Sequence, residues 1–243
     1  MSKKKMLFSR NGVSPFLANL VAYYPLNSDA NDYKGTNNGT PTNITYGSGK
    51  VGNSAVFNGS TSKIIIPNNI DFTPTNGTND VPMSWSFWVN KNVNASFMQL
   101  ISRRQTNGQI EYLIFIDSSN QITVSIFSSN STSIYIKKIS NIAINNSVWN
   151  NVVITYDGTG DYNGIKIYIN SVLTDFNTGT GNSGTYVKCN NNGSNLALGI
   201  GEWFGGNVLD GKLDEVAIWK NRELTSTEVL EAYNLGNAGT PLI

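Results

Sequence analysis

The residues of this chain that could do chemistry are few, and the clearest are two adjacent carboxylates, Asp214 and Glu215. Adjacent residues on a strand point to opposite faces of a sheet, so the two do not face one another as the acid and base of a glycosidase must. The sequence contains no His, which excludes His-dependent triads and His-based metal sites. The single Cys, Cys189, has no base nearby in the sequence, which indicates a structural thiol. We therefore predict no catalytic residue and no enzymatic activity.

Asp214 is the residue that most needs a partner. It has the same strand parity as Val216 and Ile218, so if those two face the core, the carboxylate points inward near a strand end. A buried carboxylate is costly unless it is paired. Two partners are open at this point: a calcium ion, which takes six to eight oxygen ligands, or the backbone N–H groups of a turn that the carboxylate caps.

Two loops contain candidate ligand-binding side chains. Residues 201–207 place Trp203 in a Gly-rich loop, where its ring could stack on a sugar while Glu202 or Asn207 bonds to hydroxyl groups; alternatively, Trp203 covers a sheet edge. In loop 157–164, Asp157 and Asn163 could serve a ligand in the same way, although their spacing is also that of an ordinary turn.

The elements that must position these residues are almost all strands. Alternating apolar residues and Gly, Asn and Ser clusters between them predict an all-β fold, a two-sheet antiparallel sandwich. Thr225 and Glu228 have the spacing of a capping box and predict one short C-terminal helix over 225–234. The expected strands are residues 20–25, 54–57, 63–67, 83–89, 97–102, 111–116, 121–127, 133–138, 151–156, 165–170, 196–200 and 212–219.

Composition limits the class of partner. The 243 residues have a net charge of +1 and only 14% charged side chains, which argues against nucleic acid and anionic membranes as partners. The N-terminus lacks the apolar core of a signal peptide, and no segment reaches the length of a membrane span. We expect a soluble protein that is not exported by a standard signal, with neither nucleic acid nor membrane as a partner.

Several segments, taken together and in order, resemble the laminin-G-like, concanavalin A-like jelly-roll family found in phage and bacterial surface proteins. They are LVAYYPLNSDAND at 20–32, NNGT at 37–40, GNSAVFNG at 52–59, MSWSFWV at 83–89, WNNVVITYDG at 149–158, IKIYIN at 165–170, GKLDEVAIW at 211–219 and the helix at 224–233. The resemblance implies a jelly roll over residues 20–235. It also implies one structural calcium ion near Asp214, with Asp29, Asp32 and Asn58 as the matching oxygen donors.

Residues 1–19 lie outside the resemblance and form an N-terminal arm, and residues 236–243 form a C-terminal tail. The arm mixes cations with apolar side chains, which suits a peptide that lies across another protein. The expected contact residues are Lys3, Lys4, Lys5, Leu7, Phe8, Arg10 and Phe16.

The predicted function is that of a non-catalytic phage virion structural protein, a capsid decoration, head fibre or tail-associated protein. Its arm would contact capsid or fibre subunits, or further copies in a homo-oligomer, and its jelly roll could bind a glycan of the host or of mucus. The alternative is a free carbohydrate-binding or adhesion module at a bacterial cell surface. The expected location is the virion surface or, in the alternative, the cell surface or the extracellular space.

Overall fold

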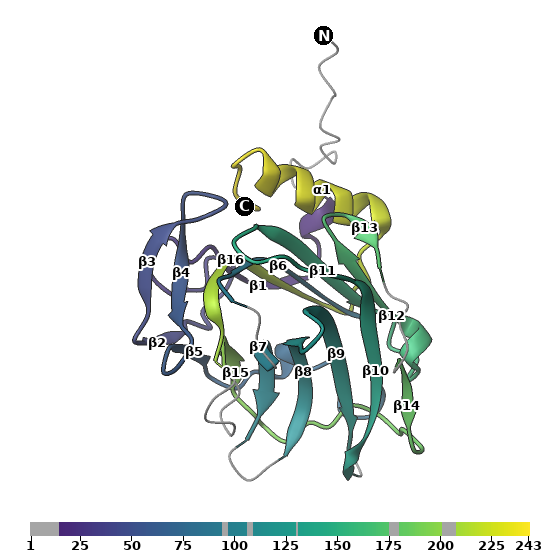
Figure 1. Cartoon of the computed structure of the whole chain (residues 1–243). Helices are drawn as coiled ribbons and strands as arrows, with labels where there is room; N and C mark the ends of the chain where they lie inside the picture. Colours follow the sequence, from purple (N-terminus) through teal and green to yellow (C-terminus); the bar gives the residue numbers. More distant parts are fainter. Residues whose placement is uncertain (1–14, 94–96, 106–108, 130, 175–179, 201–207) are drawn as a thin grey trace.

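The computed structural model describes residues 15–93, 97–105, 109–129, 131–174, 180–200 and 208–243. Within these residues two antiparallel sheets stack face to face, and a single α-helix, α1 (Ser226–Asn237), lies outside them (Figure 1). The all-β sandwich that the alternating pattern predicts is confirmed, and its arrangement is that of a jelly roll. No helix in the described part of the chain has the length and apolar character needed to cross a membrane.

Sheet A has the order β13-β12-β11-β6-β16-β4-β3, with β1 also paired to β16. Sheet B has the order β14-β10-β9-β8-β7-β15-β5-β2. The strands of sheet A are β1 (Leu20–Tyr24), β3 (Thr45–Ser48), β4 (Asn53–Asn58), β6 (Met83–Lys91), β11 (Asn150–Tyr156), β12 (Ile165–Ile169), β13 (Val172–Leu173) and β16 (Asp210–Lys220). Those of sheet B are β2 (Thr40–Thr42), β5 (Lys63–Ile66), β7 (Phe97–Arg104), β8 (Ile110–Asp117), β9 (Gln121–Ser128), β10 (Ser131–Ala143), β14 (Gly181–Ser183) and β15 (Leu196–Leu198). The described part of the chain also forms three short 3-10 helices: η1 (Pro15–Leu17), η2 (Ile70–Phe72) and η3 (Tyr162–Gly164).

Each of the twelve expected strands is present, and the four further strands that the structure describes, which sequence patterns did not predict, are all edge strands. β13 and β3 end sheet A, and β14 and β2 end sheet B. They have two to four residues each, and their side chains are mostly exposed or half-buried. An edge strand that buries little apolar surface has no alternating pattern to reveal it.

The main core fills the space between the two sheets. Trp85 and Phe87 of β6 and Ile114 of β8 are fully buried there. Trp85 Nε1 donates to the hydroxyl of Tyr112, 3.2 Å away, so even the polar edge of this large ring has a partner inside the core.

Helix α1 starts as the sequence predicts. Thr225 is its N-cap and Glu228 completes a capping box, in which the hydroxyl and the carboxylate each accept a backbone N–H. The helix packs on the outer face of sheet A, where Val229 and Ala232 join a second buried cluster with Trp219 of β16.

Phe16 belongs to this second cluster, so its predicted role in partner binding is wrong. The side chain is 1% exposed, and its ring lies 5.2 Å from that of Trp219. Trp219 Nε1 also donates to the backbone carbonyl of Phe16 at 2.9 Å. The aromatic side chain gains more by covering this chain's own sheet than by remaining available to another chain.

Candidate functional site

The adjacent carboxylates Asp214 and Glu215 lie at an irregularity in β16 that the sequence pattern does not reveal. The register with β6 shifts between Asp214 and Ala217, and Glu215 has a φ of +53°. This β-bulge reverses the alternation. Leu213 therefore lies in the main core together with Val216 and Ile218, and Asp214 does not share their face. The expectation that Asp214 points into the core is wrong for this reason.

Asp214 caps a turn, which is the second of the two roles that its sequence context left open. Its Oδ2 accepts the backbone N–H groups of Lys50 at 2.7 Å and Val51 at 2.9 Å. Burial raises the pKa of its carboxyl to about 6, although these N–H donors work in the opposite direction. Its Oδ1 is buried without a hydrogen-bond partner.

The three other predicted calcium ligands serve three further turns. Asp32 accepts the backbone N–H of Tyr23 and of Lys34, both at 3.0 Å, through Oδ1. Asn58 pairs with Asp210, four residues along β16 from Asp214, and its Oδ1 accepts the N–H groups of its own loop, residues 60–62.

Asp29 accepts the backbone N–H of Asn31 at 3.0 Å. The four oxygen donors are thus not gathered into one ligand set, and the described residues contain no group of three or more acidic or Cys side chains that could hold a metal ion. As arranged, the predicted set does not fit calcium.

Where the structure describes the predicted ligand-binding loops, their polar side chains form hydrogen bonds within the same loop. Asp157 Oδ1 accepts from the N–H and hydroxyl of Thr159, and Asn163 donates to Asp161 within the same loop. Glu202, Trp203 and Asn207 lie outside the described residues, as do Lys3, Lys4, Lys5, Leu7, Phe8 and Arg10.

The outer face of sheet B carries an aromatic surface that the sequence patterns described above did not predict. On β8, Tyr112, Ile114 and Ile116 point into the main core, so the alternate residues Leu113 and Phe115 point outward. The same alternation on the other strands places further residues on this face. They are Phe97 and Gln99 on β7, Thr123, Ser125 and Phe127 on β9, and Tyr135 and Lys137 on β10.

Two ring pairs dominate this surface, which we call the aromatic face. Phe97 and Phe115 stack with centroids 4.2 Å apart, and Phe127 and Tyr135 pack at 5.4 Å with tilted planes. Lys137 Nζ lies 5.8 Å from the centroid of the Tyr135 ring. Phe97, Phe115 and Tyr135 are half-buried, so part of each ring remains available to a ligand.

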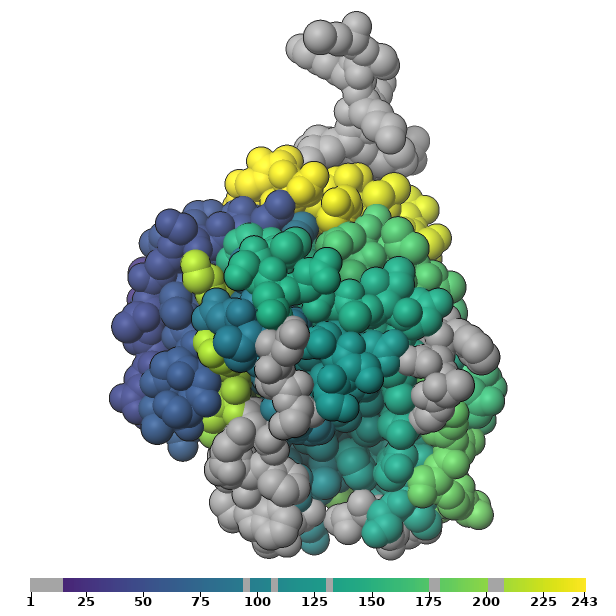
Figure 2. Space-filling model, viewed as in Figure 1, coloured from purple at the N-terminus to yellow at the C-terminus, as the bar shows by residue number. Residues whose placement is uncertain are grey.

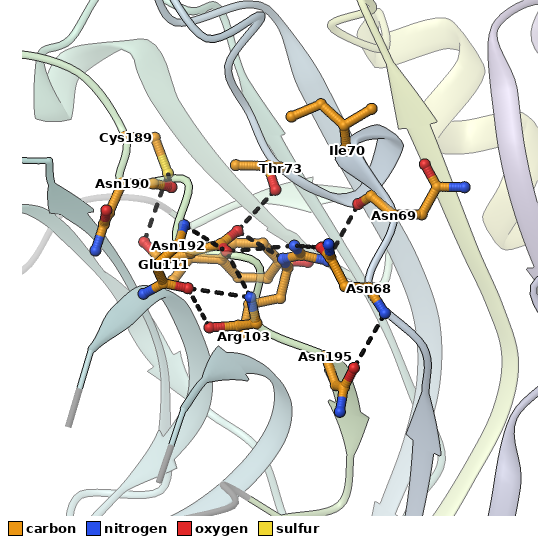
Figure 3. A network of polar contacts seen from close by, with 12 residues as sticks. Asn68, Asn69, Ile70, Thr73, Arg103, Glu111, Cys189, Asn190, Asn192 and Asn195 are labelled. Carbon is orange, nitrogen blue, oxygen red and sulfur yellow. Dashed lines mark hydrogen bonds and ion pairs between the residues drawn. The ribbon is translucent and has the colours of Figure 1, made fainter. Parts of the chain in front are cut away.

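A buried polar network connects the adjacent ends of β7 and β8 to residues 68–73 and 189–195 (Figure 3). Arg103 and Glu111, both fully buried, form an ion pair of 2.6 Å between Nε and Oε2. Arg103 Nη2 also donates to Asn68 Oδ1 at 2.8 Å, and the hydroxyl of Thr73 donates to Glu111 Oε2 at 2.7 Å. The backbone N–H groups of Asn192 and Ser194 reach Glu111 Oε1 at 3.2 and 3.1 Å. Every charge is therefore hydrogen-bonded, which is the condition for burying an ion pair.

The network fixes the segment that borders the aromatic face. Just before Asn192, the N–H of Asn190 donates to the carbonyl of Phe127 at 2.8 Å, and its side chain donates to that of Ile110 at 3.2 Å. Cys189 is fully buried in this segment, and burial raises the pKa of its thiol well above the ordinary value. The thiol is therefore held in its unreactive form, in agreement with a structural role.

One signal in the sequence could have revealed the aromatic face. Strands 110–117 and 121–128 are apolar at alternate positions toward the core, yet they also carry Leu113, Phe115 and Phe127 at the other parity. Apolar side chains of that size on both faces of a strand indicate that the second face is either covered by another part of the chain or contacts a ligand. Which strands lie side by side, and hence that the rings form one surface, depends on the register of sheet B.

Comparisons with known proteins agree on one fold. A model of the concanavalin A-like lectin/glucanases superfamily, of the Laminin_G_3 type, matches residues 58–230. Domain 4 of AbnA, a GH43 extracellular arabinanase from Geobacillus stearothermophilus, solved in complex with arabinotriose, has a TM-score of 0.66 and 21% identity. That match covers 88% of this chain and 98% of the domain. No curated protein matches the sequence.

Toxin domains have the same fold over part of their length. The binding domain of Paraclostridial Mosquitocidal Protein 1 matches with a TM-score of 0.71 and 18% identity, over 90% of this chain and 52% of that one. The receptor binding domain of botulinum neurotoxin type G matches with a TM-score of 0.60 and 17% identity, over 90% of this chain and 51% of that one. This chain thus spans about half of each toxin domain, and at these identities the likeness shows the fold alone.

Proposed function

Because this chain belongs to the concanavalin A-like lectin/glucanases superfamily, which confirms the resemblance seen in its sequence, we propose that it is a non-catalytic carbohydrate-binding module. The aromatic face of sheet B is its glycan site. The observation that carries this proposal is the pair of ring contacts, Phe97 with Phe115 and Phe127 with Tyr135, on the outer face of a sheet. Rings of this kind supply rigid apolar area to the flat face of a sugar, and Tyr adds a hydroxyl group.

The arrangement of the carboxylates supports binding without turnover. Asp214 caps a turn, and Glu215 accepts from the hydroxyl of Tyr23 at 2.7 Å and from the N–H of Leu242 at 3.0 Å on the α1 side of the molecule. Glu111 is neutralised by Arg103. A glycosidase needs two carboxyl groups free to face one sugar across a short gap. These three instead maintain the fold.

The position of the chain ends favours a further, finer proposal: attachment of this module to a virion through residues 1–14. Phe16 packs under α1 on the outer face of sheet A, and the tail is fixed there by Leu242. Both ends of the domain therefore leave it on the α1 side, away from the aromatic face (Figure 1). An anchored arm would leave the glycan site free, whether the support is a phage particle or a cell surface.

Binding tests the main proposal. Arabinotriose, the ligand present in the arabinanase domain structure, is the first probe, followed by a panel of neutral oligosaccharides, with isothermal titration calorimetry as the measurement. We expect Tyr135→Ala to abolish binding. The matched control is Tyr233→Ala: Tyr233 is also half-buried and also in a ring pair, with Trp88 at 5.8 Å, but on the α1 side. Equal losses in both variants, or binding by neither the parent protein nor any variant, would refute the proposal.

Deletion of residues 2–14 tests the attachment. The cut spares Phe16, so the domain should stay folded and retain its glycan binding. We expect it to lose incorporation into particles, measured by co-sedimentation with assembled virions. Normal incorporation of the truncated protein would contradict the anchoring role of the arm and favour the free surface module.

A further inference from the structure

Gln99 is a buried amide with nothing to bond to. Its side chain is fully buried, and both Oε1 and Nε2 lack a hydrogen-bond partner. Within the described residues it is the one side chain with two such orphaned atoms. Buried polar groups are almost always satisfied, so each exception needs an explanation.

The position of Gln99 connects it to the aromatic face. Met98, the preceding residue on β7, points into the main core, and Gln99 points the other way. Directly across the strand pair lies Phe115, and Phe97 is two residues along on the same face. The amide therefore lies beside the stacked rings of Phe97 and Phe115.

Folding alone does not account for an amide here. An apolar side chain of similar size would avoid the desolvation of two polar atoms and would pack as well against the two phenyl rings. Sites where a sequence violates such rules are commonly functional ones, where the missing partner is supplied by a ligand.

We propose that Gln99 is the specificity-determining residue of the glycan site, and that it selects an uncharged sugar with two adjacent hydroxyl groups. This rests on the proposed function and adds the ligand class to it. One hydroxyl donates to Oε1 and its neighbour accepts from Nε2, while the sugar ring packs on the adjacent phenyl rings. A carboxamide offers a donor and an acceptor side by side, which matches the spacing of such a pair.

The enclosed setting explains why the contact would be selective. Hydrogen bonds are stronger in a site that excludes water, and an analogue that lacks a hydroxyl leaves the buried amide unpaired. Since Gln99 is covered in the free protein, the ligand must displace neighbouring side chains to reach it. Rotamer changes of this kind are common when a binding surface is occupied.

The test is Gln99→Leu, measured for both stability and affinity. We expect its melting temperature to rise by a few degrees, because two unsatisfied atoms are removed, and its affinity for arabinotriose, or for whichever neutral oligosaccharide of the panel the parent protein binds most tightly, to fall at least tenfold. The matched control is Asn151→Leu: Asn151 is also buried with an orphaned Oδ1, but it lies in sheet A. It should leave the affinity unchanged.

Monodeoxy versions of the bound sugar test the same point without altering the protein. Loss of at least tenfold in affinity for two adjacent positions is expected, and equal binding of all of them would overturn the inference. So would a Gln99→Leu protein that binds normally or melts at a lower temperature. If Tyr135→Ala abolishes binding while Gln99→Leu does not, the role of Gln99 fails and the glycan site stands; if the parent protein binds no sugar, both fail.

Discussion

The two sheets each have eight strands within the described residues, but their outer faces differ in how far they are covered. On sheet A, α1, η1 and the C-terminal tail cover the strands, and Trp219 and Tyr23 of the sheet and Phe16 of η1 are almost completely buried between the sheet and this cover. On sheet B the rings of Phe97, Phe115 and Tyr135 remain half-buried, and the one α-helix of the described chain lies elsewhere. Figure 2 shows the C-terminal part of this cover as the yellow surface at the top of the molecule.

This difference indicates that the outer face of sheet A contributes to stability and that the outer face of sheet B serves recognition. A covered aromatic residue contributes its full transfer free energy to folding, whereas a half-covered one retains apolar area for a ligand. The covered face should therefore respond to substitution with loss of stability, and the aromatic face with loss of binding.

The largest effect is expected for Trp219→Ala on the covered face. The change removes a fully buried ring, its contact with Phe16 and a hydrogen bond, so the free energy of unfolding should fall by about 3–5 kcal/mol. Denaturant unfolding measures this. Phe115→Ala on the aromatic face should cost only about 1–2 kcal/mol, because part of that ring is already in water. If both variants lose the same free energy of unfolding, the two faces do not differ in their contribution to stability.

Next in size is Glu111→Gln, in the buried polar network. The change leaves the buried Arg103 cation without a counter-charge and should cost about 3 kcal/mol. It should also weaken glycan binding, because the segment that contains Asn190 loses its support. The double variant Arg103→Met/Glu111→Leu should be less destabilised than Glu111→Gln. If it is more destabilised, the ion pair stabilises the fold more than we infer.

The pH dependence of stability should come from the α1 side of sheet A. Burial raises the pKa of Glu215 to about 7, from an ordinary value of 4.5, and that of Asp214 to about 6. The folded chain then binds protons more readily than the unfolded chain, so the free energy of unfolding should rise as the pH falls from 8 to 5. A rise of up to about 4 kcal/mol is expected, since Glu215 contributes about two pKa units over this range and Asp214 about one, and one unit corresponds to about 1.4 kcal/mol.

Glu215→Gln isolates the contribution of that carboxyl group. The variant should show a smaller rise between pH 8 and pH 5, measured by urea unfolding at each pH. A parent protein that loses stability over this range, or a variant with an unchanged slope, would contradict the assignment.

A smaller effect is expected at the start of α1. Thr225→Ala removes the N-cap hydroxyl and should cost about 1 kcal/mol, measured by thermal unfolding. Thr225→Ser, which retains the hydroxyl, is the control and should cost much less. Because α1 is part of the cover of sheet A, glycan binding should be unaffected by either change.

The smallest effect is expected for removal of divalent cations. The four predicted calcium ligands serve four separate turns, so EDTA should leave the melting temperature unchanged. A fall that added calcium reverses, and that Asp214→Ala abolishes, would instead establish a metal site at the free Oδ1 of Asp214.

The sequence by itself determined the parts of this protein that depend on local pattern. Apolar, partly alternating runs between Gly, Asn and Ser clusters located twelve of the strands, and the Thr225–Glu228 spacing located the one α-helix of the described residues and its cap. Both signals are local because they follow from backbone geometry within a few residues. The order of the segments was sufficient to indicate the family, and the absence of His excluded whole classes of chemistry.

Only the tertiary structure decided which side chains meet and which face is covered. One bulged residue, Glu215, reversed the alternation of β16 and moved Asp214 off the core face. Phe16, 203 residues away from Trp219, turned out to belong to the fold. Phe115 and Gln99 became neighbours through the register of β7 with β8. Register and cover depend on contacts between segments far apart in the chain, and a one-residue shift changes the face of every side chain that follows, so no local pattern determines them.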